Sequence, residues 1–334
     1  MKFRFIKKHI LFCIFFTTTF VMFSQQTVVD ANIVSDFNNA LKLYNDKAYA
    51  AAQKGFEKVQ NTAKGSSSLK ADATYYDAMC AIRLNQTTAD EKVLNFVDEN
   101  PTSNKKNKAF FNVANYYFAN KKAAHALKWY EKVNTDLLSE ENKKELNFKM
   151  GYGLLVAKAY ELSKDKFLPL INDPKYGNDS RYYYGYIAYK LEDYGIAAST
   201  LKQIENDKTY KAEISYYLLD ISFKAGEFEK CIEVGTELLK TARRNDISEI
   251  SKIIGESYFN LEKYAAAIPY LKGYTGKGGK LNNTDYYQLG YAFYKQNDFE
   301  TAISYFNKII DEKNTVSQNA YYHLAECYLN IDKK

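Results

Sequence analysis

The chain has 334 residues, 46% of them hydrophobic, which is ample material for a core but long for one compact domain. Tyrosine (31) and phenylalanine (21) are plentiful while proline (4) and glycine (15) are scarce, which favours long helices joined by short turns and excludes a disordered or fibrous chain. Four of the 46 basic residues lie among the first eight residues, and the remaining 42 nearly balance 40 acidic residues, which argues against nucleic acid as a partner.

The first 24 residues have the order of a secretory signal peptide. A basic stretch, Lys2–Lys8, precedes an apolar run, Ile10–Phe23, and Ser24 then stands before two glutamines. We expect cleavage after Ser24, with an uncleaved membrane anchor as the alternative because Met22 is a poor small residue upstream of the cut. The Ser-Gln-Gln junction resembles signal peptides of the Bacteroidota, so we expect an exported protein, periplasmic or secreted, that works in the bacterial cell envelope.

Residues 25–334 repeat one pattern of aromatic, small and apolar residues over pairs of predicted helices. The clearest copy has Tyr286, Leu289, Gly290 and Phe293 on a first helix and Phe299, Ala302 and Phe306 on a second. The small residue of each first helix marks the repeat, and these anchor residues are Ala40, Ala78, Ala114, Gly151, Gly185, Leu219, Gly255, Gly290 and Ala325. Successive anchors lie 34 to 38 residues apart.

A Gly or Ala where two helices cross lets their backbones approach closely, and neither helix can bury its apolar stripe without a neighbour. The pattern resembles the tetratricopeptide repeat, a helix-turn-helix unit of about 34 residues. The resemblance implies an all-α fold of tandem helix-turn-helix repeats stacked in a right-handed superhelical solenoid. Residues 25–334 would hold about eight to nine repeats, the last one incomplete, with Tyr264 in the core of its repeat.

Two repeats depart from the pattern. One has Leu219 where a small residue belongs and carries Cys231 and Gly235 on its second helix, and the other has Ser163 ahead of Phe167. Because the helix crossing depends on these positions, we expect these two junctions to be the loosest or the most bent.

The last anchor lies on a predicted helix that has no second helix after it. Repeat arrays normally finish with a helix whose outer face is polar, whereas Tyr321, Tyr322, Tyr328 and Leu329 leave little polar surface here. We therefore expect exposed apolar helix surface at this end, and we interpret the chain as a piece of a longer protein.

Few residues could support catalysis. Cys80, Cys231 and Cys327 remain after the expected cleavage, an odd number on apolar helical faces, which predicts buried thiols in place of a disulfide framework. His125 and His323 lie far apart beside predicted core residues, and no Cys or His pair has metal-ligand spacing. We predict no catalytic, cofactor-binding or metal site, and a protein that is not an enzyme.

In the tetratricopeptide-repeat family, ligands lie along a concave face lined by the first helices. The resemblance places on this face the residues three before, one after, four after and five after each anchor. The predicted partner-binding residues are Phe111, Asn115, Phe118, Tyr182, Tyr186, Tyr189, Lys190, Tyr216, Phe223, Lys224, Tyr287, Tyr291, Tyr294 and Lys295. A tyrosine suits such a face because it shows a partner both a ring and a hydroxyl, but the alternative is that each ring packs against the next repeat.

The leading hypothesis is a non-enzymatic protein-protein interaction scaffold of the cell envelope that holds a protein or peptide segment on this aromatic face. One alternative is a platform for glycan or peptidoglycan, since tyrosine rings also stack on sugars. Another is the docking arm of a larger protein that continues beyond Lys334. We expect no nucleic acid partner, no cofactor, and no membrane association except through an uncleaved signal anchor.

Overall fold

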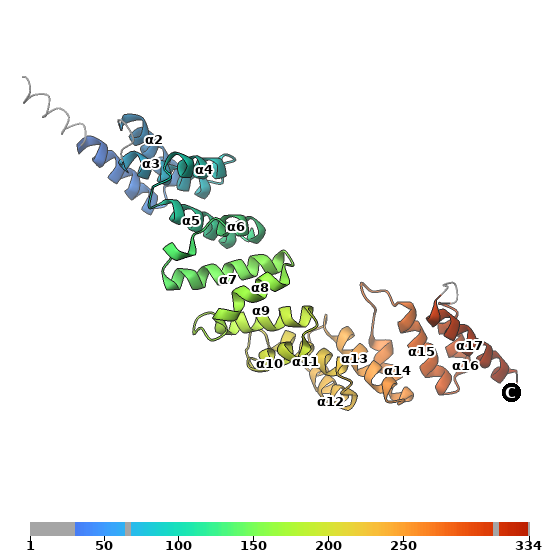
Figure 1. Ribbon diagram of the computed structural model, residues 1–334. Helices are drawn as coiled ribbons and strands as arrows, with labels where there is room; N and C mark the ends of the chain where they lie inside the picture. The colour runs from blue at the N-terminus through green and yellow to red at the C-terminus, as the bar shows by residue number, and fades with distance from the viewer. Residues whose placement is uncertain (1–30, 64–67, 310–313, 333–334) are drawn as a thin grey trace, which may run out of the picture. The chain divides into compact units, whose positions relative to one another are not determined.

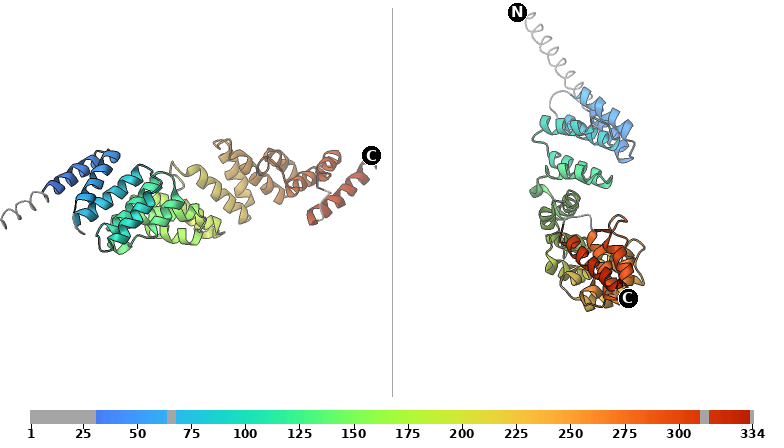
Figure 2. Two further views of the ribbon diagram at one scale, coloured as in Figure 1. Left: turned by 90° about the horizontal axis from the view of Figure 1, so that it is seen from above. Right: turned by 90° about the vertical axis from the view of Figure 1, so that its right-hand side faces the viewer.

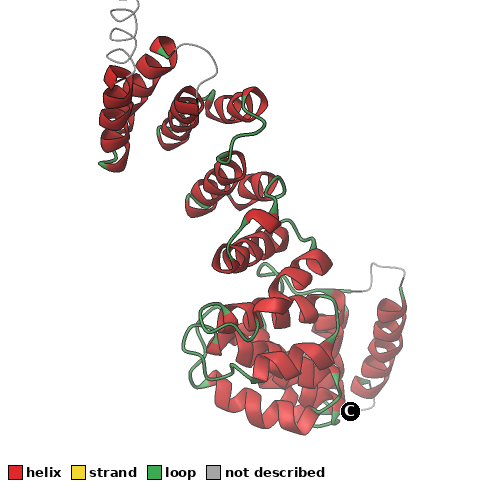
Figure 3. Ribbon diagram, turned by 60° about the vertical axis from the view of Figure 1, so that its left-hand side comes forward, coloured by secondary structure: helices red, strands yellow, loops and turns green. Residues whose placement is uncertain are grey.

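The computed structural model describes residues 31–63, 68–309 and 314–332. Within these ranges the regular secondary structure is helical, apart from one isolated bridge between Lys277 and Lys280 (Figure 3). The predicted signal peptide, residues 1–24, and its expected cleavage site lie outside the described residues. No helix in the described ranges is long and apolar enough to span a membrane.

First and second helices alternate along the chain, as the repeat pattern predicts (Figure 1). The first helices are residues 31–45, α3 (Ser68–Arg83), α5 (Lys106–Ala119), α7 (Glu140–Val156), α9 (Gly177–Lys190), α11 (Lys211–Lys224), α13 (Ile247–Asn260), α15 (Asn283–Lys295) and α17 (Thr315–Ile331). The second helices are α2 (Tyr49–Thr62), α4 (Ala89–Glu99), α6 (Ala123–Tyr130), α8 (Tyr160–Phe167), α10 (Tyr194–Lys202), α12 (Phe228–Leu239), α14 (Tyr264–Gly273) and α16 (Phe299–Phe306). Short 3-10 turns, η1 (Thr135–Leu137) and η2 (Leu168–Leu170), precede α7 and α9.

The chain divides into two compact units, Met1–Lys166 and Phe167–Lys334, which we call the N-terminal and C-terminal units. Within the units, first and second helices pack as pairs: α5 with α6, α9 with α10, α13 with α14, and α15 with α16 (Figure 2). The all-α fold of tandem helix-turn-helix pairs is therefore confirmed.

Polar residues start several of these helices. The side chains of Asp193 and Asp298 accept hydrogen bonds from the backbone N–H groups three residues later, which would otherwise lack a partner. Asn282 and Asp285 form a reciprocal capping box at the start of α15. These local signals mark where α10, α15 and α16 begin.

The turn between the two helices has the same register in every complete pair. The residue seven positions after the anchor has a positive φ, between 52° and 76°, and these residues are Lys47, Asn85, Lys121, Lys158, Glu192, Gly226, Glu262 and Asn297. Only one is glycine, although the left-handed conformation costs other residues roughly 1 kcal/mol. Packing of the helix pair therefore imposes the turn on whatever residue stands there.

A small residue on one helix meets a large residue on its partner. In the C-terminal unit, a Cβ added to Gly185 would lie 2.7 Å from Leu201, and one added to Gly290 would lie 2.8 Å from Phe306. Gly255 is covered by Leu271 in the same way. The absent side chain is therefore what lets each pair of helices cross closely.

The repeat of α11 and α12 reverses this arrangement. Leu219 stands at the anchor and is 2% exposed, and Gly235 stands sixteen residues later, where the neighbouring repeats have a large residue. A Cβ on Gly235 would lie 2.7 Å from Ile254 of α13 and 3.6 Å from Leu219. The large residue and the small residue have exchanged helices.

At the second departure from the pattern, the Ser163 side chain forms a hydrogen bond to the first helix of its own repeat. Ser163 is fully buried, and its hydroxyl donates to the carbonyl of the anchor Gly151 at 2.7 Å. Cys231, at the corresponding position of its repeat, donates to the carbonyl of Leu219 at 3.7 Å. Cys80, Cys231 and Cys327 are all buried and unpaired.

The last first helix, α17, has one apolar face in solvent. Its anchor, Ala325, is exposed, in contrast to the buried anchors before it, because no described helix follows to cross it. Tyr321, Tyr322, Tyr328 and Leu329 are each at least half exposed. The expectation of exposed apolar surface on this helix is therefore confirmed.

Candidate partner-binding face

The residues predicted to bind a partner fall into both units. Eleven of them lie on α9, α11 and α15 of the C-terminal unit, and three lie on α5 of the N-terminal unit. We call the surface formed by those eleven residues the first-helix face of the C-terminal unit. Its tyrosines are half-buried, so that each has both packing contacts and solvent-exposed atoms.

The tyrosines of α9 contact aromatic residues of the next repeat. Tyr182 stacks on Tyr210 with 4.0 Å between ring centroids, and Tyr186 lies 5.6 Å from Tyr217. Burial raises the pKa of Tyr182 to about 12. Tyr189 donates its hydroxyl hydrogen bond to Asp220 of α11 at 2.7 Å, and burial together with this bond raises its pKa.

The tyrosines of α15 surround a histidine of the next repeat. Tyr291 and Tyr294 each lie 5.0 Å from the ring of His323 on α17, and Tyr287 lies 6.2 Å from it. Tyr294 donates to Glu326 at 2.9 Å, and His323 bonds the same carboxylate at 2.9 Å. The bond from His323 is the main reason that the pKa of Glu326 is lowered.

The two tyrosine sets thus share one register. In each, the residue four after the anchor donates to a carboxylate one after the next anchor: Tyr189 to Asp220, and Tyr294 to Glu326. These two hydroxyls therefore join one repeat to the next. For Tyr189 and Tyr294, the alternative that the side chain packs against the next repeat is the one that the contacts favour.

The lysines that follow these tyrosines lie over aromatic rings. The Lys190 ammonium is 5.4 Å from the ring centre of Tyr186 and 5.8 Å from that of Tyr189. The Lys295 ammonium is 5.5 Å from Tyr291 and 5.9 Å from Tyr264. Both lysines are exposed, and among the described residues neither has a carboxylate within ion-pair distance.

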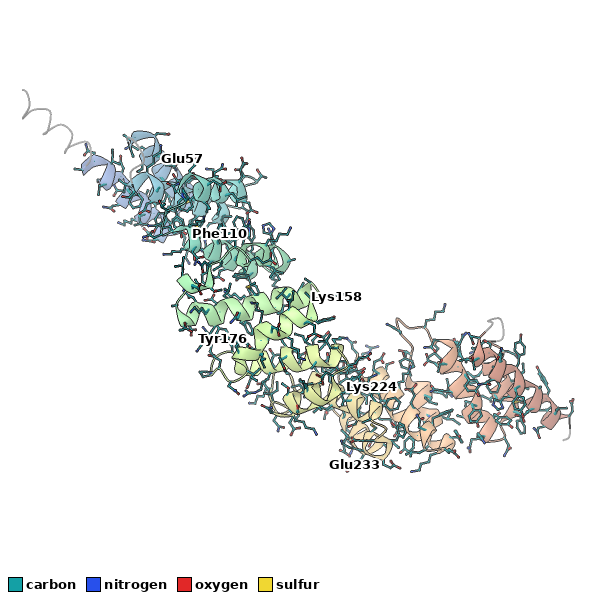
Figure 4. The ribbon with its side chains drawn as sticks, viewed as in Figure 1. Glu57, Phe110, Lys158, Tyr176, Lys224 and Glu233 are labelled. Atoms are coloured by element: carbon teal, nitrogen blue, oxygen red, sulfur yellow. The ribbon has the colours of Figure 1, made fainter. Side chains whose placement is uncertain are left out.

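The α11 residues differ from these two sets. Lys224, labelled in Figure 4, lies over Tyr194 at 5.6 Å and is 3.8 Å from Asp220, so its charge has a partner. Tyr216 packs against the core around Leu219, and burial raises its pKa to about 12. Phe223 meets Phe228 edge to face. This helix joins its neighbours more than it faces solvent.

In the N-terminal unit the three predicted partner-binding residues are buried or already contact other side chains. Phe111 is 7% exposed and belongs to the core, so its ring is not available to a partner and we leave it out of the proposed surface. Asn115 accepts hydrogen bonds from Tyr130 and Lys149. Phe118 is half-buried and packs against Tyr152.

Sequence reasoning missed several residues that complete the face. Tyr210, Tyr217 and His323 fall outside the four positions counted from each anchor, yet they contact the predicted tyrosines. Tyr264, expected in the core, is only half-buried and packs against Tyr291 and Phe259. A count of all aromatic residues on each first helix would have found Tyr217, but contacts between repeats cannot be read from one repeat.

The two histidines outside the predicted signal peptide each join a carboxylate that also accepts from a tyrosine. His125 bonds Asp90 at 2.9 Å, and Tyr117 donates to the same carboxylate. His323 and Tyr294 do the same at Glu326. Both histidines therefore have a structural role in connecting helices. Within the described ranges, no group of three His, Cys, Asp or Glu residues could hold a metal ion.

Residues 254–317 and 287–331 match the tetratricopeptide repeat family, whereas no curated protein gives a significant match. Among solved structures, Naa15/Naa10 bound to HypK-THB is 13% identical with a TM-score of 0.50, covering 89% of this chain and 55% of that chain. A tetratricopeptide repeat protein from Parabacteroides merdae is 14% identical with a TM-score of 0.42, covering 77% and 98%. YrrB, titled a TPR protein with an unusual peptide-binding site, is 16% identical with a TM-score of 0.42, covering 64% and 96%.

Identity this low shows the fold alone. The family match covers the last repeats, and the turn register extends the same helix-turn-helix unit to the earlier ones. The family match itself is limited to residues 254–317 and 287–331, and the earlier helix pairs share the helix-turn-helix register of that region.

Proposed function

We propose that this protein is a non-enzymatic protein-protein interaction scaffold, exported to the bacterial cell envelope, that binds a partner segment on the first-helix face of its C-terminal unit. The helix pairs of the C-terminal unit hold the side chains in place, and the chemistry of binding comes from half-exposed rings and the lysines beside them. Export rests on the predicted signal peptide, residues 1–24.

One observation supports the location. Lys190 and Lys295 stand in the same register of two repeats, each beside tyrosines of its own helix and each without an ion-pair partner in the described chain. An ammonium held against rings keeps its charge available, and the rings offer apolar contact at low entropic cost. Two equivalent sites on one unit suit an extended partner better than a small molecule.

The test changes the lysines without touching the core. The double variant Lys190→Gln with Lys295→Gln should keep the wild-type melting temperature and lose at least tenfold in affinity for the partner captured from an envelope extract. The matched control is Lys240→Gln with Lys272→Gln, two exposed lysines of the same unit outside this face. Equal capture by both double variants would overturn the proposal.

Purified peptidoglycan run beside the extract separates the glycan alternative. Retention of the protein by peptidoglycan, with loss in Tyr186→Ala, would favour sugar stacking over a protein partner. Export is tested separately by sequencing the mature N-terminus after cell fractionation. We expect Gln25, and recovery of Met1 in the membrane fraction would indicate an uncleaved anchor.

A further inference from the structure

A pocket of about 300 Å³ opens between α10, α11 and α12 of the C-terminal unit. Leu218, Leu219 and Ile221 of α11 form its apolar floor, and Val234 of α12, whose side chain is 42% exposed, lies at its edge. None of the residues of the first-helix face lines the pocket. Figure 4 labels Lys224, which belongs to that face, and Glu233 of α12 on another side of the same repeat. Its volume fits one large side chain and is small for a cofactor.

Two small residues create the space. Ala198 of α10 lines the pocket, and the corresponding residues of the next three second helices are Ile232, Ile268 and Ile303. Ala225, at the end of α11, also lines it, and the corresponding residues of two neighbouring repeats are Leu191 and Leu261. These neighbouring repeats therefore carry large apolar side chains at the two positions where this repeat and α10 carry only alanine.

The reversed pair of this repeat contributes to the same opening. Because Gly235 has no side chain, Ile254 of α13 packs directly on its backbone, and α12 packs more extensively on α13 than on α11. In the neighbouring repeats a large residue of the second helix packs back onto its own first helix. Without such a residue, α12 leaves part of the α11 surface uncovered.

The rim of the pocket is charged on the α10 side. Lys202 and Glu205 stand there, and neither forms an ion pair in the described part of the chain. On the α12 side, Glu227 and Lys230 pair with each other, and Lys230 and Lys202 both help to lower the pKa of Glu227. The α10 rim thus offers one positive and one negative group to an incoming segment.

We infer that this pocket is a second docking site, which binds a partner peptide segment through one large apolar anchor residue flanked by an acidic and a basic side chain. The anchor fills the space that Ala198 and Ala225 leave, and the flanking charges complement Lys202 and Glu205. This inference is independent of the first-helix face and goes beyond the proposed function.

A displayed library of 12-residue peptides, selected on the full mature chain, provides the probe. Ala198→Ile introduces the residue that the next three repeats use, so it should keep or raise the melting temperature by filling the cavity. The same variant should weaken the selected peptides at least tenfold. A structural role alone cannot give this combination of higher stability and lower affinity.

Ala225→Leu is the second variant and should behave in the same way if Ala198→Ile fails to fold. Gln296→Leu is the matched control, because it places the same residue at the corresponding position of the α15 repeat and should leave peptide binding unchanged. The inference is overturned if selected peptides lack a large apolar anchor, or bind Ala198→Ile and wild type equally. If peptide binding is lost in Lys190→Gln but kept in Ala198→Ile, the peptides bind the first-helix face and the inference is wrong. If the protein forms a dimer that Ala198→Ile abolishes, the occupant of the pocket is a second copy of the chain and the inference is also wrong.

Discussion

The repeat of α15 and α16 and the repeat of α11 and α12 fill the same register with opposite residues. The first has Gly290 under Phe306, whereas the second has Leu219 above Gly235. The first has Tyr294 bonded to Glu326, whereas the second has Phe223, which carries no hydroxyl for Glu256. The comparison teaches that the fold needs one small and one large residue at the crossing and does not specify which helix supplies each.

The largest expected effect is on Leu219, the large residue that stands at the anchor position of the α11 and α12 repeat. Leu219→Ala should lower the free energy of unfolding by about 3 kcal/mol, because it removes a large side chain that is only 2% exposed, and urea denaturation measures the loss. Leu329→Ala, which truncates a side chain 60% exposed, is the control and should change little. A loss below about 1 kcal/mol at Leu219 would mean that the reversed pair is loosely packed and not an alternative solution.

The ordinary pair should resist any added atom. Gly290→Ala places a methyl group 2.8 Å from Phe306 and should cost about 1 to 3 kcal/mol. Gly195→Ala is the matched control, since a Cβ there has no heavy atom within 4 Å and should gain up to about 1 kcal/mol in α10. Thermal unfolding of the two variants should therefore shift in opposite directions.

The hydrogen bond between Tyr294 and Glu326 should be reproducible at the corresponding position of the α11 repeat. Tyr294→Phe removes the donor to Glu326 and should cost about 0.5 to 1 kcal/mol, because the bond is only partly buried. Phe223→Tyr adds a hydroxyl at the corresponding position before Glu256 and should stabilise by a similar amount. Destabilisation by Phe223→Tyr would show that the α11 junction has no room for the donor that the α15 junction uses.

The smallest effect is on the pH dependence of unfolding. The pKa of Glu326 is lowered, mainly by His323, so its contribution is present above the ordinary glutamate pKa and is lost as pH falls through the folded pKa. Burial raises the pKa of Glu256, so its protonated form is favoured in the folded chain. Stability linked to Glu256 is therefore present at low pH and lost as pH rises through its folded pKa.

Urea denaturation from about pH 7 to about pH 3 should separate the two carboxylates. Glu326→Gln should lose its disadvantage against wild type as pH falls, whereas Glu256→Gln should be more stable than wild type near neutral pH and should lose that advantage over the same range. Parallel curves for the two variants would contradict the assignment of opposite pKa shifts.

Part of the face could be predicted from sequence and part could not. Counting from Gly185 and Gly290 correctly places two tyrosine sets on equivalent helix positions, because helical periodicity fixes which side chains share a side. The same count places Phe111 there, yet that ring is buried. The rule contains no information about the neighbouring helix that covers a residue, and so it cannot separate the exposed rings from the buried ones.

The sequence by itself determined the pairing of helices, their number of residues per repeat, and the positions where two backbones cross, because these follow from local periodicity and side-chain size. Only the tertiary structure decided that the hydroxyls of Tyr189 and Tyr294 donate hydrogen bonds to the next repeat. It also decided that Lys158, Glu192 and Glu262 adopt the left-handed backbone conformation. It also decided that Ala198 and Ala225 line a pocket. Each of these depends on atoms that lie in another helix, and helix packing brings them together only after the repeats have stacked.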